Sequence, residues 1–197
     1  MMRTNNIAIL NDTLDICEKG YYITDSGKKV ELKLSKPQMK SCTVYLSSQV
    51  QEICNSKDAS HVHVIGRVGV GCSNTESFTL ARSRAENASF LLPDRDEKRV
   101  LILNLANPVH PGGGVRRGAN AQEEDLCRKS SLLLPLENRT AQKYYKYNSS
   151  LHTYMGSDAI IITPYVEIIK DEDGNLLDET TVVSVMTCAA PMLRNGM

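Results

Sequence analysis

The chain reads Asn104-Leu105-Ala106-Asn107-Pro108-Val109-His110-Pro111-Gly112-Gly113-Gly114-Val115-Arg116-Arg117-Gly118-Ala119-Asn120-Ala121-Gln122-Glu123-Glu124 in the stretch that decides its fold. An apolar run over residues 99–105 leads into this stretch, and its composition predicts a strand that is buried on both faces. A loop rich in glycine and proline follows. From Ala121 to about Leu134 the pattern predicts a helix that begins with acidic residues. A strand, a glycine loop and a helix in this order are typical of an α/β fold.

The rest of the chain alternates helical and strand patterns on either side of this stretch. Ile7, Leu10, Leu14 and Cys17 follow helical spacing before Gly20. Residues 21–34 have the alternation and the central turn of a hairpin. Further strands are predicted at 43–46, 61–65, 159–163, 166–170 and 182–187, with helices at 47–54 and 78–88 and a turn at Asp173-Gly174. Alternating strands and helices favour an α/β sandwich.

The consecutive glycines predict a loop that can approach a ligand closely. Glycine has no Cβ, so the backbone N–H groups of Gly112, Gly113 and Gly114 are accessible, and the helix N-terminus that follows favours an anion. Ligands bind beyond the carboxyl ends of strands in such sheets, which suits a pyrophosphate. A tight turn is the simpler explanation of the glycines taken alone. The loop lacks the Lys-Ser/Thr of a triphosphate-binding loop and the glycine spacing of a dinucleotide-binding fold.

Gln122-Glu123-Glu124 places carboxylates within one loop of the glycines. Acidic residues in a first helical turn complement the helix dipole, which is one explanation of them. The other explanation is chemical, because cleavage of a glycosidic bond needs a carboxylic acid to protonate the leaving oxygen. Adjacent helical residues point about 100° apart, so one glutamate faces a given ligand squarely.

Gly112-Gly113-Gly114 followed after seven residues by Gln122-Glu123-Glu124 resembles the defining motif of poly(ADP-ribose) glycohydrolases. Other features resemble the microbial branch of that family and extend over nearly the whole chain. They are Gly20-Tyr21-Tyr22, Asn107, Pro111, Gly118 to Ala121, Arg128 to Ser131, Tyr144-Tyr145, Thr163-Pro164 and Thr187 to Pro191.

The resemblance implies a macrodomain-like three-layer α/β/α sandwich with a mixed sheet. It implies hydrolysis of the ribose–ribose O-glycosidic bonds of poly(ADP-ribose) to release ADP-ribose, with ADP-ribosylated proteins as partners and neither metal nor cofactor. Glu124 would be the catalytic acid and base, while Glu123 and Gln122 would hold the ribose hydroxyls and the loop. Asn107 would contact the distal ribose. The backbone of Gly112, Gly113 and Gly114 would carry the diphosphate.

The same resemblance gives an expected domain organisation. Residues 1–60 would form an N-terminal helical and hairpin segment packed on a catalytic core of residues 61–197. Members of the family continue past Pro191 through a further strand and a second glycine-rich loop that closes over the phosphates. We therefore expect the core of this chain to be incomplete at its C-terminus.

The composition excludes several classes of function. Lys plus Arg and Asp plus Glu both number 23, so a neutral chain has no general attraction to nucleic acid or to an anionic membrane. No segment has the apolar length of a signal peptide or a membrane span, so we expect a cytoplasmic protein. The six cysteines lack the spacing of a zinc site. His61 and His63 share one face of a predicted strand, where exposed histidines are a better explanation than a metal site.

Two other functions stay open at this point. An ADP-ribose-binding module without turnover would have no need of Gln122-Glu123-Glu124, and a hydrolase of mono-ADP-ribosylated proteins would use the same residues. Arg116 and Arg117 either reach polymer phosphates or form a solvated pair. The tyrosines at 144, 145 and 147 either stack on adenine or form an aromatic cluster. His110 is expected to shape the loop, and Cys127 to be a small core residue.

Overall fold

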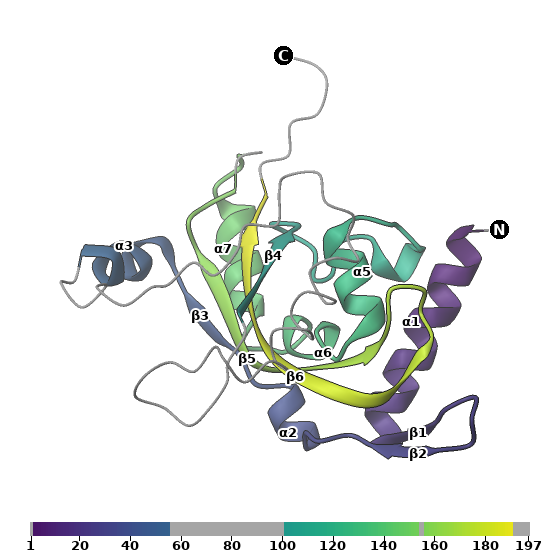
Figure 1. Cartoon of the computed structure of the whole chain (residues 1–197). Helices are drawn as coiled ribbons and strands as arrows, with labels where there is room; N and C mark the ends of the chain where they lie inside the picture. The colour runs from purple at the N-terminus through teal and green to yellow at the C-terminus, as the bar shows by residue number, and fades with distance from the viewer. Residues whose placement is uncertain (1, 56–100, 154–155, 191–197) are drawn as a thin grey trace, which may run out of the picture.

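The computed structural model describes residues 2–55, 101–153 and 156–190 (Figure 1). The helices are α1 (Met2–Lys19), α2 (Lys36–Met39), α3 (Ser47–Asn55), the short 3-10 turn η2 (Val115–Arg117), α5 (Gln122–Lys129), α6 (Leu133–Leu136) and α7 (Gln142–Ser150). The strands are β1 (Tyr21–Ile23), β2 (Lys29–Glu31), β3 (Thr43–Tyr45), β4 (Leu101–Ala106), β5 (Ile160–Lys170) and β6 (Leu176–Ala189). The predicted α/β class is confirmed. The predicted strand at 61–65 and helix at 78–88 lie outside the described residues.

The main sheet is mixed and has the strand order β3-β5-β6-β4. β4 runs parallel to β6, from the pair Leu101–Ser184 to the pair Ala106–Ala189, whereas β5 is antiparallel to both β3 and β6. Parallel strands end at the same edge of a sheet, and this edge is where ligands bind in α/β folds. The glycine loop therefore leaves β4 at the edge where a binding site is expected.

The long hairpin β5–β6 differs from the short strands that the sequence predicted. Two strands at 159–163 and 166–170 were expected, but β5 continues through Pro164 with a shift of register between Thr163 and Val166. Proline has no N–H to donate, so it fits a strand only where the pairing is irregular. The predicted turn is confirmed: Gly174 has φ +89° between the two strands.

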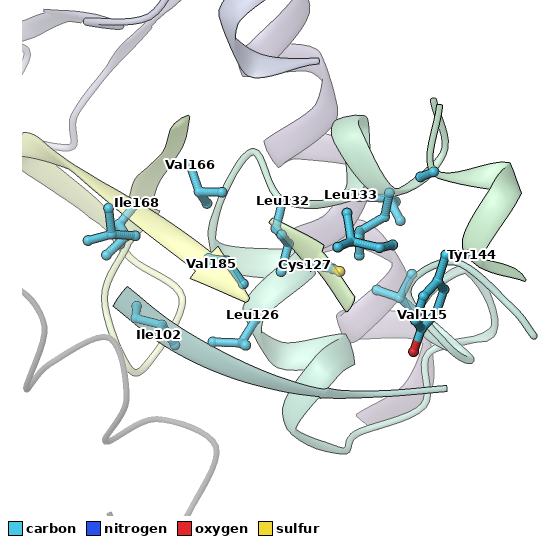
Figure 2. Packing of buried hydrophobic residues seen from close by; sticks show 14 of the residues in the cluster. Ile102, Val115, Leu126, Cys127, Leu132, Leu133, Tyr144, Val166, Ile168 and Val185 are labelled. Carbon is cyan, nitrogen blue, oxygen red and sulfur yellow. The ribbon is translucent and has the colours of Figure 1, made fainter. Parts of the chain in front are cut away.

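The main core lies between one face of the sheet and helices α5, α6 and α7. Figure 2 shows Ile102 of β4, Val185 of β6 and Leu126 of α5 packed together. Cys127 is fully buried in this cluster, which confirms its expected place in the core. The sequence pattern did not predict α7, which carries Tyr144 and Tyr145.

The helix predicted from Ala121 to Leu134 is interrupted at Ser130. Ser130 is extended, with φ −147° and ψ 175°, and forms a β-bridge with Ile168. The N–H of Ser131 then donates to the carbonyl of Glu167 at 3.0 Å. Pairing with β5 therefore replaces the helical hydrogen bonds for about one turn, and helical structure resumes at Leu133.

The prediction that the apolar run at 99–105 is buried on both faces was wrong for β4. Leu101, Leu103 and Leu105 are 56%, 42% and 47% exposed, while the alternate residues Ile102, Asn104 and Ala106 are buried. β4 is the last strand of the described sheet. Helices α5, α6 and α7 contribute to the core on the face of β4 that carries Ile102, and not on the face that carries the three leucines. The strand therefore alternates between core and solvent, which a run of apolar residues does not reveal.

The N-terminal segment contains the expected helix and hairpin. Gly20, with φ +80°, ends α1, and β1 pairs with β2 in antiparallel fashion. A second core cluster joins α1 and this hairpin to Ile169 of β5. β3 also lies in this segment and pairs with β5 in the main sheet. None of the described helices is long and apolar enough to cross a membrane.

Candidate active site

Asn107 follows the last residue of β4 and shapes the loop that leaves the sheet. Its side-chain oxygen accepts hydrogen bonds from the N–H groups of Val109 and His110, both at 2.9 Å. Such a turn closes locally around an Asn side chain. The N–H of Asn107 donates to Glu123 Oε2 at 2.7 Å. The structure thus joins the end of β4 to the first turn of α5, as the sequence motif requires.

The glycines allow the loop to lie directly against the two glutamates. Gly113 has φ +57°, and a Cβ on it would lie 2.6 Å from Glu124 Oε1 and 3.0 Å from Glu123 Oε2. Gly112 has φ +65°, and a Cβ there would lie 2.6 Å from Leu133. Both positions need glycine for two independent reasons, backbone conformation and space. The two carboxyl groups therefore converge on Gly113.

Glu124 is held by backbone donors on both of its oxygens. Gly114 N–H donates to Oε1 at 2.8 Å and Ala121 N–H donates to Oε2 at 2.9 Å. The second bond is one half of a capping box, because a residue at the third helical position reaches back to the N-cap. Ala121 has only a methyl group and cannot supply the other half. Glu124 is 7% exposed, so its carboxyl group is fixed in position and orientation.

The N–H groups of the glycine loop donate within the protein. Gly113 N–H donates to the carbonyl of His110 and Val115 N–H to the carbonyl of Gly112, both at 3.0 Å, while Gly114 N–H is bound to Glu124. In the structure the lack of a Cβ on Gly113 therefore allows the carboxyl groups of Glu123 and Glu124 to lie close to the loop backbone. The predicted role of the glycines in carrying a diphosphate stays a prediction.

Glu123 is the more deeply buried of the two acids. Burial raises the pKa of Glu123 from its usual 4.5 to about 8, and the charge of Glu124 raises it further. Hydrogen bonds from the N–H groups of Asn107 and Gly112 and from the side chain of Asn104 oppose this rise. The raised pKa of Glu123 favours the protonated carboxyl group near neutral pH, and its Oε1 is buried without a partner among the described residues.

Gln122 connects α5 to the edge of β4 that faces away from β6, where no described strand pairs. Its Oε1 accepts from Leu105 N–H at 2.7 Å, and its Nε2 donates to the carbonyl of Leu103 at 2.9 Å. The amide side chain imitates a neighbouring strand and fixes the start of the helix against the sheet. This supports the predicted role of Gln122 in holding the loop geometry, while its contact with ribose stays a prediction.

Comparison with known proteins identifies the family of this chain. Residues 11–171 match the family model for the microbial-type PARG, catalytic domain. This chain belongs to that family. PARG denotes poly(ADP-ribose) glycohydrolase, the family that the glycine and glutamate motif resembles. A search of curated proteins found no significant match.

Solved structures of bacterial PARG have the same fold. The enzyme from Thermomonospora curvata is 26% identical with a TM-score of 0.76, and the match covers 95% of this chain and 65% of that one. Its structure bound to the inhibitor ADP-HPD has a TM-score of 0.73 at 26% identity, over 95% and 63% of the two chains. The Deinococcus radiodurans enzyme in complex with ADP-ribose is 29% identical with a TM-score of 0.62, over 79% and 56%. This chain therefore spans about two thirds of the T. curvata chain and less of the D. radiodurans chain.

This PARG-family site also contains buried polar groups that the sequence did not reveal. The hydroxyls of Tyr144 and Tyr145 have no hydrogen-bond partner among the described residues, and burial raises the pKa of both, with a further contribution from the charge of Glu123. Asn104 Nδ2 donates to Thr187 Oγ1 at 3.1 Å on the same side of the sheet. A polar Asn inside an apolar strand was the available signal for this cluster.

The two tyrosines answer one of the alternatives left open by the sequence. Tyr144 and Tyr145 are 0% and 3% exposed, and their rings pack edge to face with centroids 5.1 Å apart. Neither ring is available to stack on adenine in this structure, and the aromatic-cluster interpretation holds for both.

The loop arginines have different surroundings. Arg116 forms a two-pronged pair with Glu137, at 2.8 and 2.7 Å, and its side chain is 56% exposed, as expected of a solvated residue. Arg117 folds back, so its Nη2 lies 3.9 Å from the point where Gly114 would carry a Cβ. No group of His, Cys, Asp and Glu that could hold a metal lies within the described residues, and His61 and His63 lie outside them.

Proposed function

We propose that this protein is a poly(ADP-ribose) glycohydrolase that releases ADP-ribose from the polymer and so removes ADP-ribosylation from proteins. The observation that supports this most strongly is the convergence of Glu123 and Glu124 on Gly113, at the edge of the sheet where ligands bind. The structures of the related enzymes with ADP-ribose and with ADP-HPD support the same ligand class.

Glu124 would carry the proton transfers. With the substrate bound, Glu124 would first take up a proton, which the negative charge of the nearby diphosphate favours. It would then protonate the departing ribose oxygen as the bond between that oxygen and the anomeric carbon breaks, and afterwards take a proton from the water that adds to the anomeric carbon. The proton that leaves Glu124 is thus returned to it. Hydrogen bonds from Gly114 and Ala121 support this role because they fix the direction of the carboxyl group.

Glu123 would bind the ribose rather than transfer a proton. A protonated carboxyl group with a free Oε1 is suited to a hydrogen bond with a sugar hydroxyl. Asn107 and Gln122 would keep the ribose side of the loop in place. Gly112, Gly113 and Gly114 would lie along the diphosphate, and neither a metal nor a cofactor takes part.

The enzyme would act inside the cell. Within the described part of the chain, Cys17, Cys42, Cys54, Cys127 and Cys188 are all free thiols. Free thiols are typical of a reducing compartment, where disulfides are rare.

The direct test is an incubation of the purified protein with poly(ADP-ribose), in which the release of ADP-ribose is measured over time. Release that is abolished by Glu124→Gln supports the proposal. ADP-ribose binding in calorimetry with no release from any substrate would indicate a binding module. Release from mono-ADP-ribosylated protein but not from the polymer would assign the related hydrolase activity.

A further inference from the structure

The segment from Gly114 to Ala121 is a closed loop that begins and ends on Glu124. Its first N–H donates to Oε1 and its last N–H donates to Oε2, at 2.8 and 2.9 Å. Ala119 N–H donates to the carbonyl of Gly114 at 3.2 Å and closes the loop upon itself. The orientation of the carboxyl group therefore depends on the conformation of these residues.

Helix α1 contacts this loop through Arg3 and Asn6. Asn6 Nδ2 donates to the carbonyl of Gly118 at 3.1 Å, and Asn6 is 8% exposed. Gly118 has φ +74°, and a Cβ on it would overlap the carbonyl oxygen of Arg3, so the backbones of α1 and the loop are in direct contact. Figure 1 shows α1 beside α5 and the loop. Asn6 and Gly118 are 112 positions apart, so the contact is made only in the folded protein.

Arg128 holds the next two residues of the loop from the inside. Its Nη1 donates to the carbonyl of Ala119 and its Nη2 to Asn120 Oδ1, both at 2.6 Å. Asp125 balances the charge at 3.2 Å, and Arg128 is 2% exposed. A planar guanidinium with fixed donors is well suited to hold such a turn. Gly118, Ala119 and Asn120 are thus fixed between Asn6 and Arg128.

We propose that Asn6 and Arg128 are positioning residues for Glu124, and that helix α1 is a working part of the active site. The reaction in question is the one proposed above, so the inference about turnover rests on that function. Loss of either contact frees the centre of the loop, and Glu124 loses the alignment of its two backbone donors. Small errors in the alignment of a catalytic group lower the rate more than they lower the affinity for the ligand, because the alignment matters most in the transition state.

The test compares Asn6→Ala and Asn6→Asp with Ile16→Val as the matched control. Asp has the shape of Asn but, as a carboxylate, cannot donate to Gly118. Ile16 lies on the same helix, is buried, and packs in the second core cluster away from the loop. Ile16→Val should therefore weaken α1 without touching the loop. Two measurements are made: hydrogen exchange of the amides of Gly114 and Ala121, and kcat and KM for ADP-ribose release.

We expect both Asn6 variants to speed exchange at Gly114 and Ala121 by about tenfold or more, because the hydrogen bonds to Glu124 loosen. We expect kcat to fall by about 10- to 100-fold with KM within about twofold of the parent. Ile16→Val should change neither. Equal exchange at these amides in all three variants would overturn the proposal, whether or not the protein turns over. A parent protein without turnover counts against the proposed function alone, because the exchange measurement does not depend on it.

Discussion

Glu124 and Gly114 are joined by a hydrogen bond of 2.8 Å from the glycine N–H to Oε1, across ten positions of sequence. The other oxygen, Oε2, accepts from Ala121 N–H at 2.9 Å. Each oxygen thus faces a donor, and the side chain acts as an acceptor on both sides. Because both oxygens accept a hydrogen bond, a substitution that replaces one of them with a donor should disturb the site.

Glu124→Gln should affect both rate and stability. Glutamine has one acceptor and one donor, so its NH2 group must face the N–H of Gly114 or of Ala121. We expect a loss of about 1–3 kcal/mol in the free energy of unfolding, measured by urea denaturation. We expect ADP-ribose release to fall by about 10² to 10⁴, since general acid–base assistance is lost. ADP-ribose affinity, measured by calorimetry, should change little.

Glu137→Gln is the control for this substitution. Glu137 is an exposed carboxylate that pairs with Arg116 at the rim of the same loop. Its variant should release ADP-ribose at the parent rate. If Glu124→Gln also keeps the parent rate, Glu124 is not the catalytic acid and the neighbouring Glu123 becomes the candidate.

Gly113→Ala should damage the site through space rather than through the backbone alone. The added Cβ would lie 2.6 Å from Glu124 Oε1, and one of the two carboxyl groups must move. Gly27 provides a matched control, because it has φ +83° and nothing within 4 Å of a Cβ. Both alanine variants should lose about 1–2 kcal/mol to the left-handed backbone conformation. Only Gly113→Ala should also lose ADP-ribose release, and equal activity in the two variants would contradict the close packing at Gly113.

Local pattern was sufficient to predict the parts of the site that lie close together in sequence. The glycine loop, the acidic start of α5 and the turn at Gly174 follow from residue type and spacing, and the structure has them in place. The break in the helix at Ser130 could not be predicted this way. It depends on a bridge to Ile168, and no propensity within residues 121–134 indicates that partner.

The same limit applies to the polar contacts that position the site. The bond from Asn6 to Gly118 joins residues on two elements with no shared sequence signal. Asn104 of β4 and the tyrosines of α7 come close enough to Glu123 to interact electrostatically only in the folded chain, where these elements share one core. Such contacts are properties of the folded chain, so sequence reasoning assigned residues to the loop and missed the residues behind it.

Glu167→Ala should destabilise the protein, because it removes the hydrogen bonds between β5 and residues 33–34 of the N-terminal segment. Glu167 is fully buried, and its carboxylate accepts from the N–H groups of Lys33 and Leu34, at 2.7 and 3.1 Å, and from the hydroxyl of Thr180. Removal leaves these donors without an acceptor, so we expect a loss of about 3 kcal/mol or more on chemical denaturation. Glu179→Ala is the control, since Glu179 is exposed and forms a surface ion pair with Lys33 at 3.0 Å. A midpoint that is equal in the two variants would contradict this role of Glu167.

The proton on Glu123 gives the protein a defined pH dependence of stability. Burial raises the folded-state pKa of Glu123 to about 8 from its usual 4.5, which is the value expected in the unfolded chain. Between these values the folded protein binds a proton that the unfolded chain has lost. The stabilisation linked to this proton is complete below the unfolded pKa, and it is lost as the pH rises through the folded pKa. Glu123 therefore makes the folded state less stable on going from mildly acidic to mildly alkaline pH.

Glu123→Gln should remove this part of the pH dependence. Glutamine keeps an oxygen for the N–H of Asn107, bound at 2.7 Å in the parent, and places an uncharged NH2 where Oε1 has no partner among the described residues. Thermal melts of both proteins at intervals between about pH 5 and pH 9 should show the parent losing stability relative to the variant, most steeply between the unfolded and folded pKa values and levelling off above the folded pKa. Glu52→Gln, on the exposed face of α3, should follow the parent curve. If the curves of the parent and Glu123→Gln run parallel over this range, Glu123 does not carry the buried proton.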